Sequence, residues 1–148
     1  MNKDKKYIEV LNIAKSLLSK DCQSLSNMAN LCALLKEKFD FHWVGFYLVN
    51  EKNNSLYLGP FQGPLACTDI PFGKGVCGQA WSQNKILNVP DVHKFVGHIA
   101  CSSLSNSEIV IPVVSANKVI AVLDIDSIEF NAFDKMDERY LAELISFI

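Results

Sequence analysis

The chain has 148 residues, of which 49% are hydrophobic and 20% charged, and its formal net charge is −2. A chain of this kind fits one domain, residues 1–148, with a buried core, which excludes intrinsic disorder. The weak negative charge argues against nucleic acid as a partner, and without a signal peptide or a run of about 18 apolar residues we expect a soluble cytoplasmic protein that does not enter a membrane.

The N-terminal part of the sequence has the periodicity of two amphipathic helices. Apolar residues recur at helical spacing over 4–19 and again over 24–38. Ser24 or Asp21 is expected to cap the start of the second helix. These helices, over about 4–38, leave residues 41–128 for a sheet and its loops.

The character of the sequence then changes to that of a hairpin. Aromatic and β-branched residues over 41–49 and 56–61 predict two strands, and Asn53-Asn54 marks the turn between them. The passage that follows, 59–78, contains three of the five prolines and five of the seven glycines. We therefore expect it to be loop over most of its length.

A second long loop follows two short elements. The sequence predicts a helix over 75–84, a strand over 85–89, and then a loop over 90–107 that carries His93 and His98. Loops of this length are uncommon in compact domains unless they cover or line a site. Both loops are therefore candidates for a functional region.

The C-terminal part combines a second hairpin with a helix. Nearly continuous apolar runs over 108–114 and 119–126 predict two buried strands, and 133–148 predicts a final helix with Asp134 or Asn131 near its cap. Together the elements predict an α+β domain built around a central antiparallel sheet.

Five cysteines are present, an odd number that argues against a permanent disulfide framework in a reducing compartment. Cys32 lies on the apolar face of the second helix and is interpreted as a buried, inert thiol. Cys22 lies at the turn between the helices and is interpreted as incidental. The other three, Cys67, Cys77 and Cys101, lie in the loop-rich half, where packing alone does not explain them.

Three kinds of chemistry are open to the loop cysteines. A zinc site would combine them with His98 or His93, but the close pairing of ligands that is typical of zinc sites is absent. A Cys–His hydrolase would use Cys101 with His98. Thiol redox chemistry needs one activated thiolate and a second thiol within disulfide reach, which cysteines on two loops over one end of a sheet can satisfy.

Several spaced motifs resemble those of the free methionine-(R)-sulfoxide reductase family. The resemblance covers about 41–148 and rests on segments that occur in the correct order: 63–68, 70–78, 89–93, 97–101, 107–112, 122–127 and Phe133. It implies a GAF-type domain, in which helices pack on one face of the sheet and loops cover a ligand pocket on the other.

The resemblance also implies a reaction. The substrate would be free L-methionine (R)-sulfoxide, which the Cys101 thiolate attacks to leave a sulfenic acid. Cys67 would then form a disulfide with Cys101, with Cys77 as the alternative resolving residue. Thioredoxin, or another external dithiol, would reopen the disulfide, so that no bound cofactor and no metal are needed.

Three acidic residues meet the further demands of this reaction. The sulfoxide oxygen needs a proton as its bond to sulfur breaks, and the ammonium of a free amino acid needs carboxylates around it. Asp124 and Asp126 are two apart on one predicted strand and therefore share a face, and Glu108 begins the partner strand. Because crowded carboxylates do not all ionise, we assign Glu108 as the proton donor, with Asp124 and Asp126 binding the substrate.

Aromatic residues and a second copy of the chain complete the expectations. Trp43 and Tyr47 share one strand face and are candidates to pack the substrate's methyl and methylene groups. His93 and His98 flank Cys101, and either one lowers its pKa or only holds the loop.

We also expect a homodimer with a contact through the N-terminal helices, which the resemblance favours. A GAF sensor that binds a small ligand without turnover is the main alternative function.

Overall fold

The computed structural model describes residues 1–19, 21 and 23–148; Cys22, interpreted above as incidental, lies outside the described residues. The helices are α1 (Lys3–Leu17), α2 (Ser24–Lys38), α3 (Gly75–Gln83), α4 (Lys135–Ile145) and the short 3₁₀ helix η1 (Val92–Lys94). The strands are β1 (Trp43–Asn50), β2 (Ser55–Gln62), β3 (Asp69–Pro71), β4 (Leu87–Val89), β5 (Ser107–Ser115) and β6 (Lys118–Ser127).

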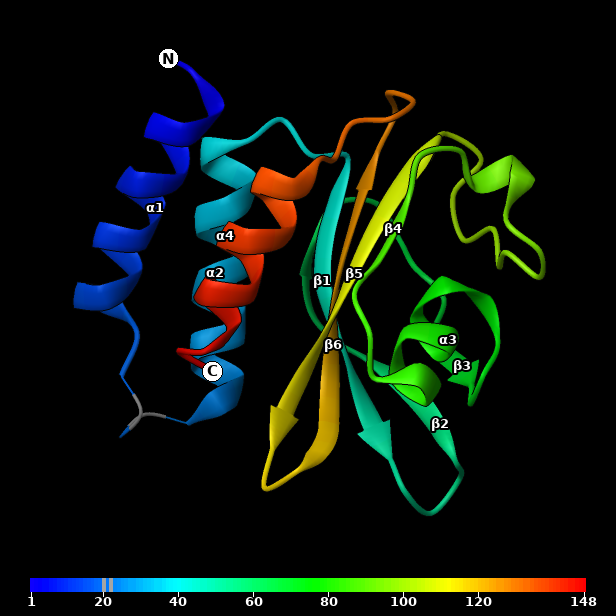
Figure 1. Ribbon diagram of the computed structural model, residues 1–148. Coiled ribbons are helices and arrows are strands. Elements are labelled where there is room, and N and C mark those ends of the chain that lie inside the picture. The colour runs from blue at the N-terminus through cyan, green and yellow to red at the C-terminus, as the bar shows by residue number, and fades with distance from the viewer. Residues whose placement is uncertain (20, 22) are drawn as a thin grey trace.

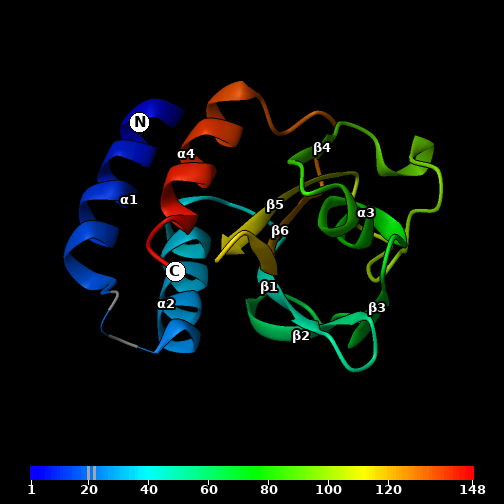
Figure 2. The same ribbon diagram turned by 60° about the horizontal axis from the view of Figure 1, so that its bottom comes forward.

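All six strands belong to one antiparallel sheet in the order β3-β2-β1-β6-β5-β4, so that β1 and β6 lie at its centre. Helices α1, α2 and α4 stack on one side of this curled sheet, and α3 lies on the other side together with the two long loops (Figures 1 and 2). The α+β prediction with an antiparallel sheet is therefore confirmed. No helix within the described residues is long and apolar enough to cross a membrane.

Strand alternation divides the core between the two faces of the sheet. Along β6, Leu123 and Ile125 point into the cluster that α1, α2 and α4 cover, whereas Val122 belongs to the cluster on the α3 side. On β1, Phe46 lies in the helix-side cluster and Tyr47 in the other. Because both faces are covered, the central strands read as nearly continuous apolar runs in the sequence.

The helical layer is held together by polar contacts as well as by its apolar faces. Asp137 of α4 is buried, accepts a hydrogen bond from the Tyr7 hydroxyl at 2.7 Å, and pairs with Lys3 at 2.6 Å. It also forms a capping box with Asp134, whose side chain accepts from the backbone N–H groups of Met136 and Asp137. These contacts join the two ends of the chain and leave the opposite face of the sheet free for a site.

Most element predictions are confirmed, with shifts at the ends. The second helix spans 24–38 as expected, and α4 begins one residue after Asp134, which is its N-cap. The predicted cap of the second helix is wrong: Gln23 occupies the cap position without a side-chain hydrogen bond, because Ser24 already has helical backbone. Strand β4 begins at Leu87, since the backbone N–H of Lys85 bonds back to α3.

The prediction that 59–78 is mostly loop is wrong in part. Strand β2 continues to Gln62 through Gly59 and Pro60, and β3 adds a three-residue edge strand paired with β2. Pro60 is tolerated because it lies where the register between β1 and β2 shifts, and beyond the three residues of β2 that pair with β3. The second loop, 90–107, contains only the single turn of η1. Residues 63–68 and 95–106 therefore remain as the two loops on the α3 side.

Candidate active site

A pocket opens on the α3 face of the sheet, at the end of the central strands where the two loops meet. Its walls come from β1, β5 and β6, from the start of α3 and from both loops. The side chains in its lining that carry chemistry are Trp43, Tyr47, Cys77, His98, Cys101, Glu108, Asp124 and Asp126. Of the residues that the sequence singled out for catalysis and binding, all but Cys67 line this one pocket.

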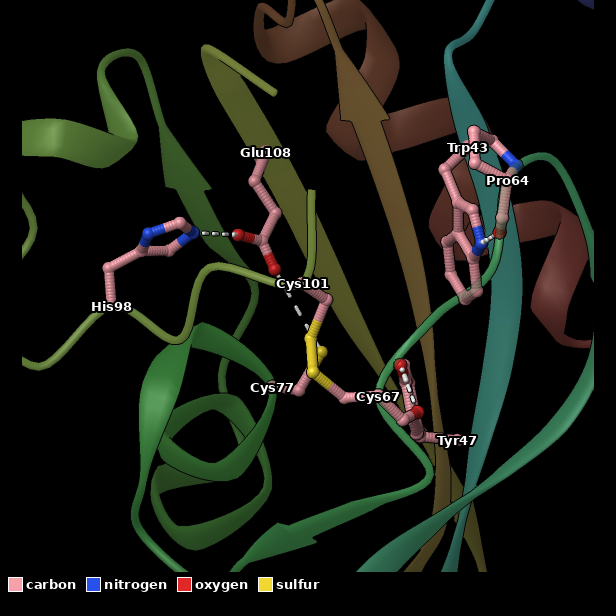
Figure 3. The surroundings of a disulfide bond; sticks show 8 residues. All are labelled: Trp43, Tyr47, Pro64, Cys67, Cys77, His98, Cys101 and Glu108. Carbon is pink, nitrogen blue, oxygen red and sulfur yellow. Dashed lines mark hydrogen bonds and ion pairs between the residues drawn. A yellow bond between two sulfur atoms is a disulfide. The ribbon is translucent and has the colours of Figure 1, made fainter. Parts of the chain in front are cut away.

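A disulfide between Cys67 and Cys101 joins the two loops at this pocket (Figure 3). The Cα atoms of the two residues are 5.5 Å apart, within the range of ordinary disulfides. Cys67 is half-buried and Cys101 is exposed, so the bond is accessible from solvent. Of the two candidate partners of Cys101, the structure joins it to Cys67.

Cys77, in contrast, is a buried thiol on the first turn of α3. Its Sγ lies 3.9 Å from Oε1 of Glu108, and ligand atoms of Cys77, Glu108 and Asp124 all lie within 4.8 Å of one another. Burial, followed by the charges of Asp124 and Glu108, raises the pKa of Cys77 well above its ordinary value. In this position Cys77 is a neutral thiol in the pocket wall.

Three carboxyl groups lie side by side on the floor of the pocket. Strand register places Glu108 of β5 directly opposite Asp126 of β6, and Asp124 lies two residues further along β6 on the same face. Glu108 and Asp124 are buried. Burial and then the neighbouring acid raise the pKa of all three well above their ordinary values, with Asp126 acting on Glu108, Glu108 on Asp124 and Asp124 on Asp126.

One oxygen of this cluster is left without a hydrogen bond. Among the described residues, none donates to Asp124 Oδ1, which is buried. A buried acceptor without a donor is costly, so a cationic or N–H group of a ligand is the natural complement of this oxygen. The sequence signal for the cluster was two acids that interrupt an otherwise apolar strand in register.

The two aromatic residues predicted to contact substrate also hold the loop that carries Cys67. Trp43 Nε1 donates a hydrogen bond to the Pro64 carbonyl at 3.1 Å, and the Tyr47 hydroxyl donates to the Cys67 carbonyl at 2.9 Å (Figure 3). Their rings stack at a centroid distance of 5.8 Å. Both side chains are buried on the pocket face of β1, as their shared strand face predicted.

The two loop histidines have different surroundings. His98 is partly buried and points its Nε2 at Oε2 of Glu108, 3.5 Å away (Figure 3). His93 is exposed and its Nε2 lies 2.9 Å from Oδ1 of Asn106.

The two alternative chemistries of the loop cysteines do not match this arrangement. A zinc site would need the three thiolates together, whereas in this structure Cys67 and Cys101 are bonded to each other. The Cys–His pair is also not formed, because the His98 ring faces Glu108.

Two contacts of the Cys101 loop had no sequence signal. The Nε2 atom of His42, just before β1, lies 3.1 Å from the hydroxyl of Ser102, and Ser105 is buried in the pocket lining. Sixty positions separate His42 from Ser102. Since no local pattern links residues so far apart, only the fold brings them together.

The comparisons with known proteins point in one direction. The GAF domain family matches residues 23–148. The free methionine-R-sulfoxide reductase of Escherichia coli is 46% identical over 147 residues, which cover 99% of this chain and 88% of that protein. GAF domain-containing protein A of Dictyostelium discoideum is 52% identical over 147 residues, with 99% and 92% covered.

A solved structure gives the same result. The free methionine-R-sulfoxide reductase of Neisseria meningitidis, in complex with its substrate, superposes with a TM-score of 0.96 at 50% identity. The match covers 99% of this chain and 88% of the other.

Proposed function

This chain is an oxidoreductase that belongs to the free methionine-R-sulfoxide reductases, a family of GAF-domain proteins, and we propose that it reduces free L-methionine (R)-sulfoxide to methionine with Cys101 as the nucleophile. The single observation that carries the assignment of residues is the accessible Cys67–Cys101 disulfide beside a pocket lined by three carboxyl groups. Such a pair of cysteines is the product of one turnover of a thiol reductase.

The reaction balances with two thiols. The Cys101 thiolate attacks the sulfoxide sulfur to form an S–S bond, and the oxygen takes two protons and leaves as water. Water then attacks Cys101 Sγ, which breaks the S–S bond, returns one proton, releases methionine and leaves Cys101 as a sulfenic acid. The Cys67 thiol then attacks the sulfenic sulfur and releases water, which gives the disulfide. The substrate sulfur is reduced by two electrons, and the two cysteines together lose two.

The carboxyl cluster supplies the other requirements. Glu108 serves as the proton donor, because burial and the charge of Asp126 favour its neutral form near neutral pH. Asp124 and Asp126 bind the ammonium group, which distinguishes a free amino acid from a methionine residue within a peptide. The unpartnered Oδ1 of Asp124 supports this role. Trp43 and Tyr47 offer apolar ring surface to the methyl and methylene groups of the substrate.

The cycle closes only if an external dithiol reopens the disulfide, and thioredoxin is the reductant that we propose. This requires a reducing compartment such as the cytoplasm. Cys101 is exposed, so a partner protein can reach the bond without unfolding the domain. We also propose a homodimer with contacts through the N-terminal helices, where Ile8 and Leu17 of α1 are exposed apolar side chains.

Turnover of separated substrates tests the proposal. The wild-type chain, supplied with dithiothreitol, is expected to produce methionine from the free R sulfoxide, and not from the free S form or from peptide-bound sulfoxide. Cys101→Ser is expected to abolish this activity. Cys32→Ser is the matched control, because Cys32 is a buried thiol of α2 that donates to the Pro60 carbonyl, a contact that serine can keep.

Two outcomes would contradict the proposal. Activity retained in Cys101→Ser would remove the nucleophile from its role. Binding of the sulfoxide by the wild-type chain without any turnover would favour a sensor instead of an enzyme. Replacing thioredoxin by dithiothreitol separates the chemistry of the site from the identity of the reductant, since only the second depends on the protein partner.

A further inference from the structure

His98 has a defined contact that the reaction above does not use. It lies three residues before Cys101 on the same loop, and its ring projects toward the pocket floor (Figure 3). Its Nε2 atom is 3.5 Å from Oε2 of Glu108, and its side chain is only 15% exposed. A ring nitrogen at this distance can donate a hydrogen bond to the carboxyl group and so fix its orientation.

The two oxygens of Glu108 face different partners. Oε2 faces the His98 ring, whereas Oε1 accepts a weak hydrogen bond from the Cys77 thiol, whose Sγ lies 3.9 Å away. Figure 3 shows the carboxyl group between the imidazole on one side and the sulfur atoms on the other. Each oxygen therefore faces a group that can donate a hydrogen, the His98 ring at Oε2 and the Cys77 thiol at Oε1, and two such contacts fix the orientation of the carboxyl group.

We propose that His98 is a positioning residue that donates its Nε2–H to Oε2 of Glu108 and thereby holds the carboxyl group in place beside the pocket. This inference rests on the proposed function, in which Glu108 protonates the sulfoxide oxygen. At 3.5 Å the two atoms are at the outer limit of a hydrogen bond, and such contacts in active sites commonly tighten only in the complex with substrate.

The protonation states of both groups agree with this arrangement. Burial lowers the pKa of His98, so that near neutral pH the ring is neutral and carries a single N–H. Burial, followed by the charge of Asp126, raises the pKa of Glu108, so that its neutral acid form is present at the same pH. The titratable groups that face Glu108 are His98 from the loop, Cys77 from α3, Tyr47 from β1, and Asp124 and Asp126 from β6.

The role predicts a change in pH dependence that a purely structural role does not. A donor at Oε2 stabilises the carboxylate form, so its removal raises the pKa of Glu108. The rate of methionine formation rises with pH as the Cys101 thiolate forms and falls again as Glu108 loses its proton. Without His98, the basic limb moves to higher pH, while the plateau falls because the carboxyl group of Glu108 is no longer held in position.

Single-turnover methionine formation by the reduced enzyme, measured against pH, tests the inference. His98→Leu is expected to lower the plateau rate about 10- to 100-fold with substrate affinity near the wild-type value, and to shift the basic limb upward. His98→Gln retains an N–H donor at similar reach and is expected to restore most of the rate. His93→Leu is the matched control on the same loop, where His93 contacts Asn106 instead of Glu108.

The outcomes separate this inference from the proposed function. A wild-type rate in His98→Leu would overturn it, as would a lower plateau with an unmoved basic limb, which indicates only a misplaced loop. A Gln variant no better than Leu would also overturn it. If instead the wild-type chain forms no methionine, or Cys101→Ser keeps the activity, then the proposed function itself fails.

Discussion

Asp124 is the residue on which the proposed ammonium site depends. Its carboxyl group is buried, and its Oδ1 has no hydrogen-bond partner in the part of the chain that the structure describes. An unsatisfied buried acceptor costs about 1–3 kcal/mol, and this cost is recovered only when a donor arrives. A free amino acid brings three N–H donors and a positive charge on one atom. This unsatisfied acceptor is the observation that supports the proposed binding of the ammonium group at Asp124.

Replacing Asp124 by Asn is expected to weaken substrate binding more than it slows the reaction. The amide keeps the shape of the side chain but loses the charge, and hydrogen bonds to charged groups contribute about 1.5–3 kcal/mol. KM for the free sulfoxide is expected to rise about 10- to 100-fold, with kcat much less affected. Steady-state kinetics with dithiothreitol measures both constants, and an unchanged KM would exclude Asp124 from ammonium binding.

Glu108→Gln is expected to have the opposite effect. Glutamine has nearly the same shape but no acidic proton, so the S–O bond must break without a general acid. Loss of such a group costs about 10²- to 10⁴-fold in the chemical step. Rapid-quench measurement of methionine formation gives this rate, and calorimetric titration of the same variant gives its substrate affinity. Turnover at the wild-type rate would move the role of proton donor to another group.

At the level of single residues, the sequence predicts the pocket where local pattern and chemistry agree. Asp124 and Asp126 interrupt an apolar strand with period two, and this alternation alone places both on the pocket face. The contact of His42 with Ser102 has no such pattern. The pairing of Cys101 with Cys67, left open against Cys77, depends on where two loops end in space.

Helix α3 is the element that places Cys77 and closes one side of the pocket. It packs so closely against β3 that a Cβ atom on Gly78 would lie 2.6 Å from the Pro71 carbonyl oxygen. Only a residue without a side chain allows this approach. The small edge strand and the short helix therefore depend on one another, although neither is long enough to be stable alone.

Gly78→Ala is expected to destabilise the protein by about 1–3 kcal/mol, the usual cost of an atom forced into a packed interface. The added methyl group has to push α3 away from β3 and carries Cys77 with it. Urea denaturation measures the loss. Ser82→Ala is the control, because Ser82 is exposed on the same helix and its substitution is expected to change stability by no more than about 0.5 kcal/mol. Equal stability of the two variants would contradict the close packing.

Element prediction succeeded where the apolar period was long and failed where an element depends on its neighbour. Helix α2 and the hairpin of β5 and β6 carry many in-phase apolar residues, which makes them visible from local sequence. Strand β3 has three residues between glycine- and proline-rich segments, and it exists only because β2 offers an unpaired edge. Tertiary pairing, not local propensity, decides such an element.

At the scale of the whole molecule, the two faces of the sheet differ in how they affect stability. The face under α1, α2 and α4 is apolar and closely packed, whereas the α3 face buries Glu108 and Asp124 beside a pocket. Buried carboxyl groups that have no cation nearby disfavour the folded state when they ionise. The apolar packing under the three helices offsets the free-energy cost of burying these carboxyl groups on the pocket face.

This arrangement makes stability depend on pH. The pKa values of Glu108, Asp124 and Asp126 are raised in the folded chain, so the folded state binds more protons than the unfolded state between the ordinary and the raised values. Stability from this source is fully present below the ordinary carboxyl pKa and is lost as pH rises through the raised values. The substrate-free protein is therefore expected to unfold more easily at about pH 8 than at about pH 5.

Asp124→Asn measures the effect of one of these groups on the whole molecule. The variant is expected to be more stable than the wild type at about pH 8, by roughly 1–3 kcal/mol, and to approach it at acidic pH. Urea denaturation of the oxidised protein at both pH values gives the comparison. Asp69→Asn, an exposed carboxyl group on β3, is expected to show no such difference. A variant less stable than wild type at alkaline pH would contradict the cost assigned to the cluster.

The substrate is expected to offset the destabilisation caused by the ionised carboxyl cluster, because its ammonium group places a positive charge beside the carboxylates. In the Cys101→Ser variant, which can form neither the sulfenic acid nor the disulfide, methionine (R)-sulfoxide binds without reacting. A ligand at 100 times its Kd stabilises a protein by about 2.7 kcal/mol, which is several degrees of Tm for a domain of this size. The increase in Tm is expected to be larger at about pH 8 than at about pH 5, because the ionised cluster attracts the ammonium more strongly. An analogue that carries the sulfoxide and carboxylate but lacks the amino group is expected to give no pH-dependent increase. If that analogue stabilises the protein as well as the amino acid does, the cluster does not recognise the ammonium, and Asp124 and Asp126 need another role.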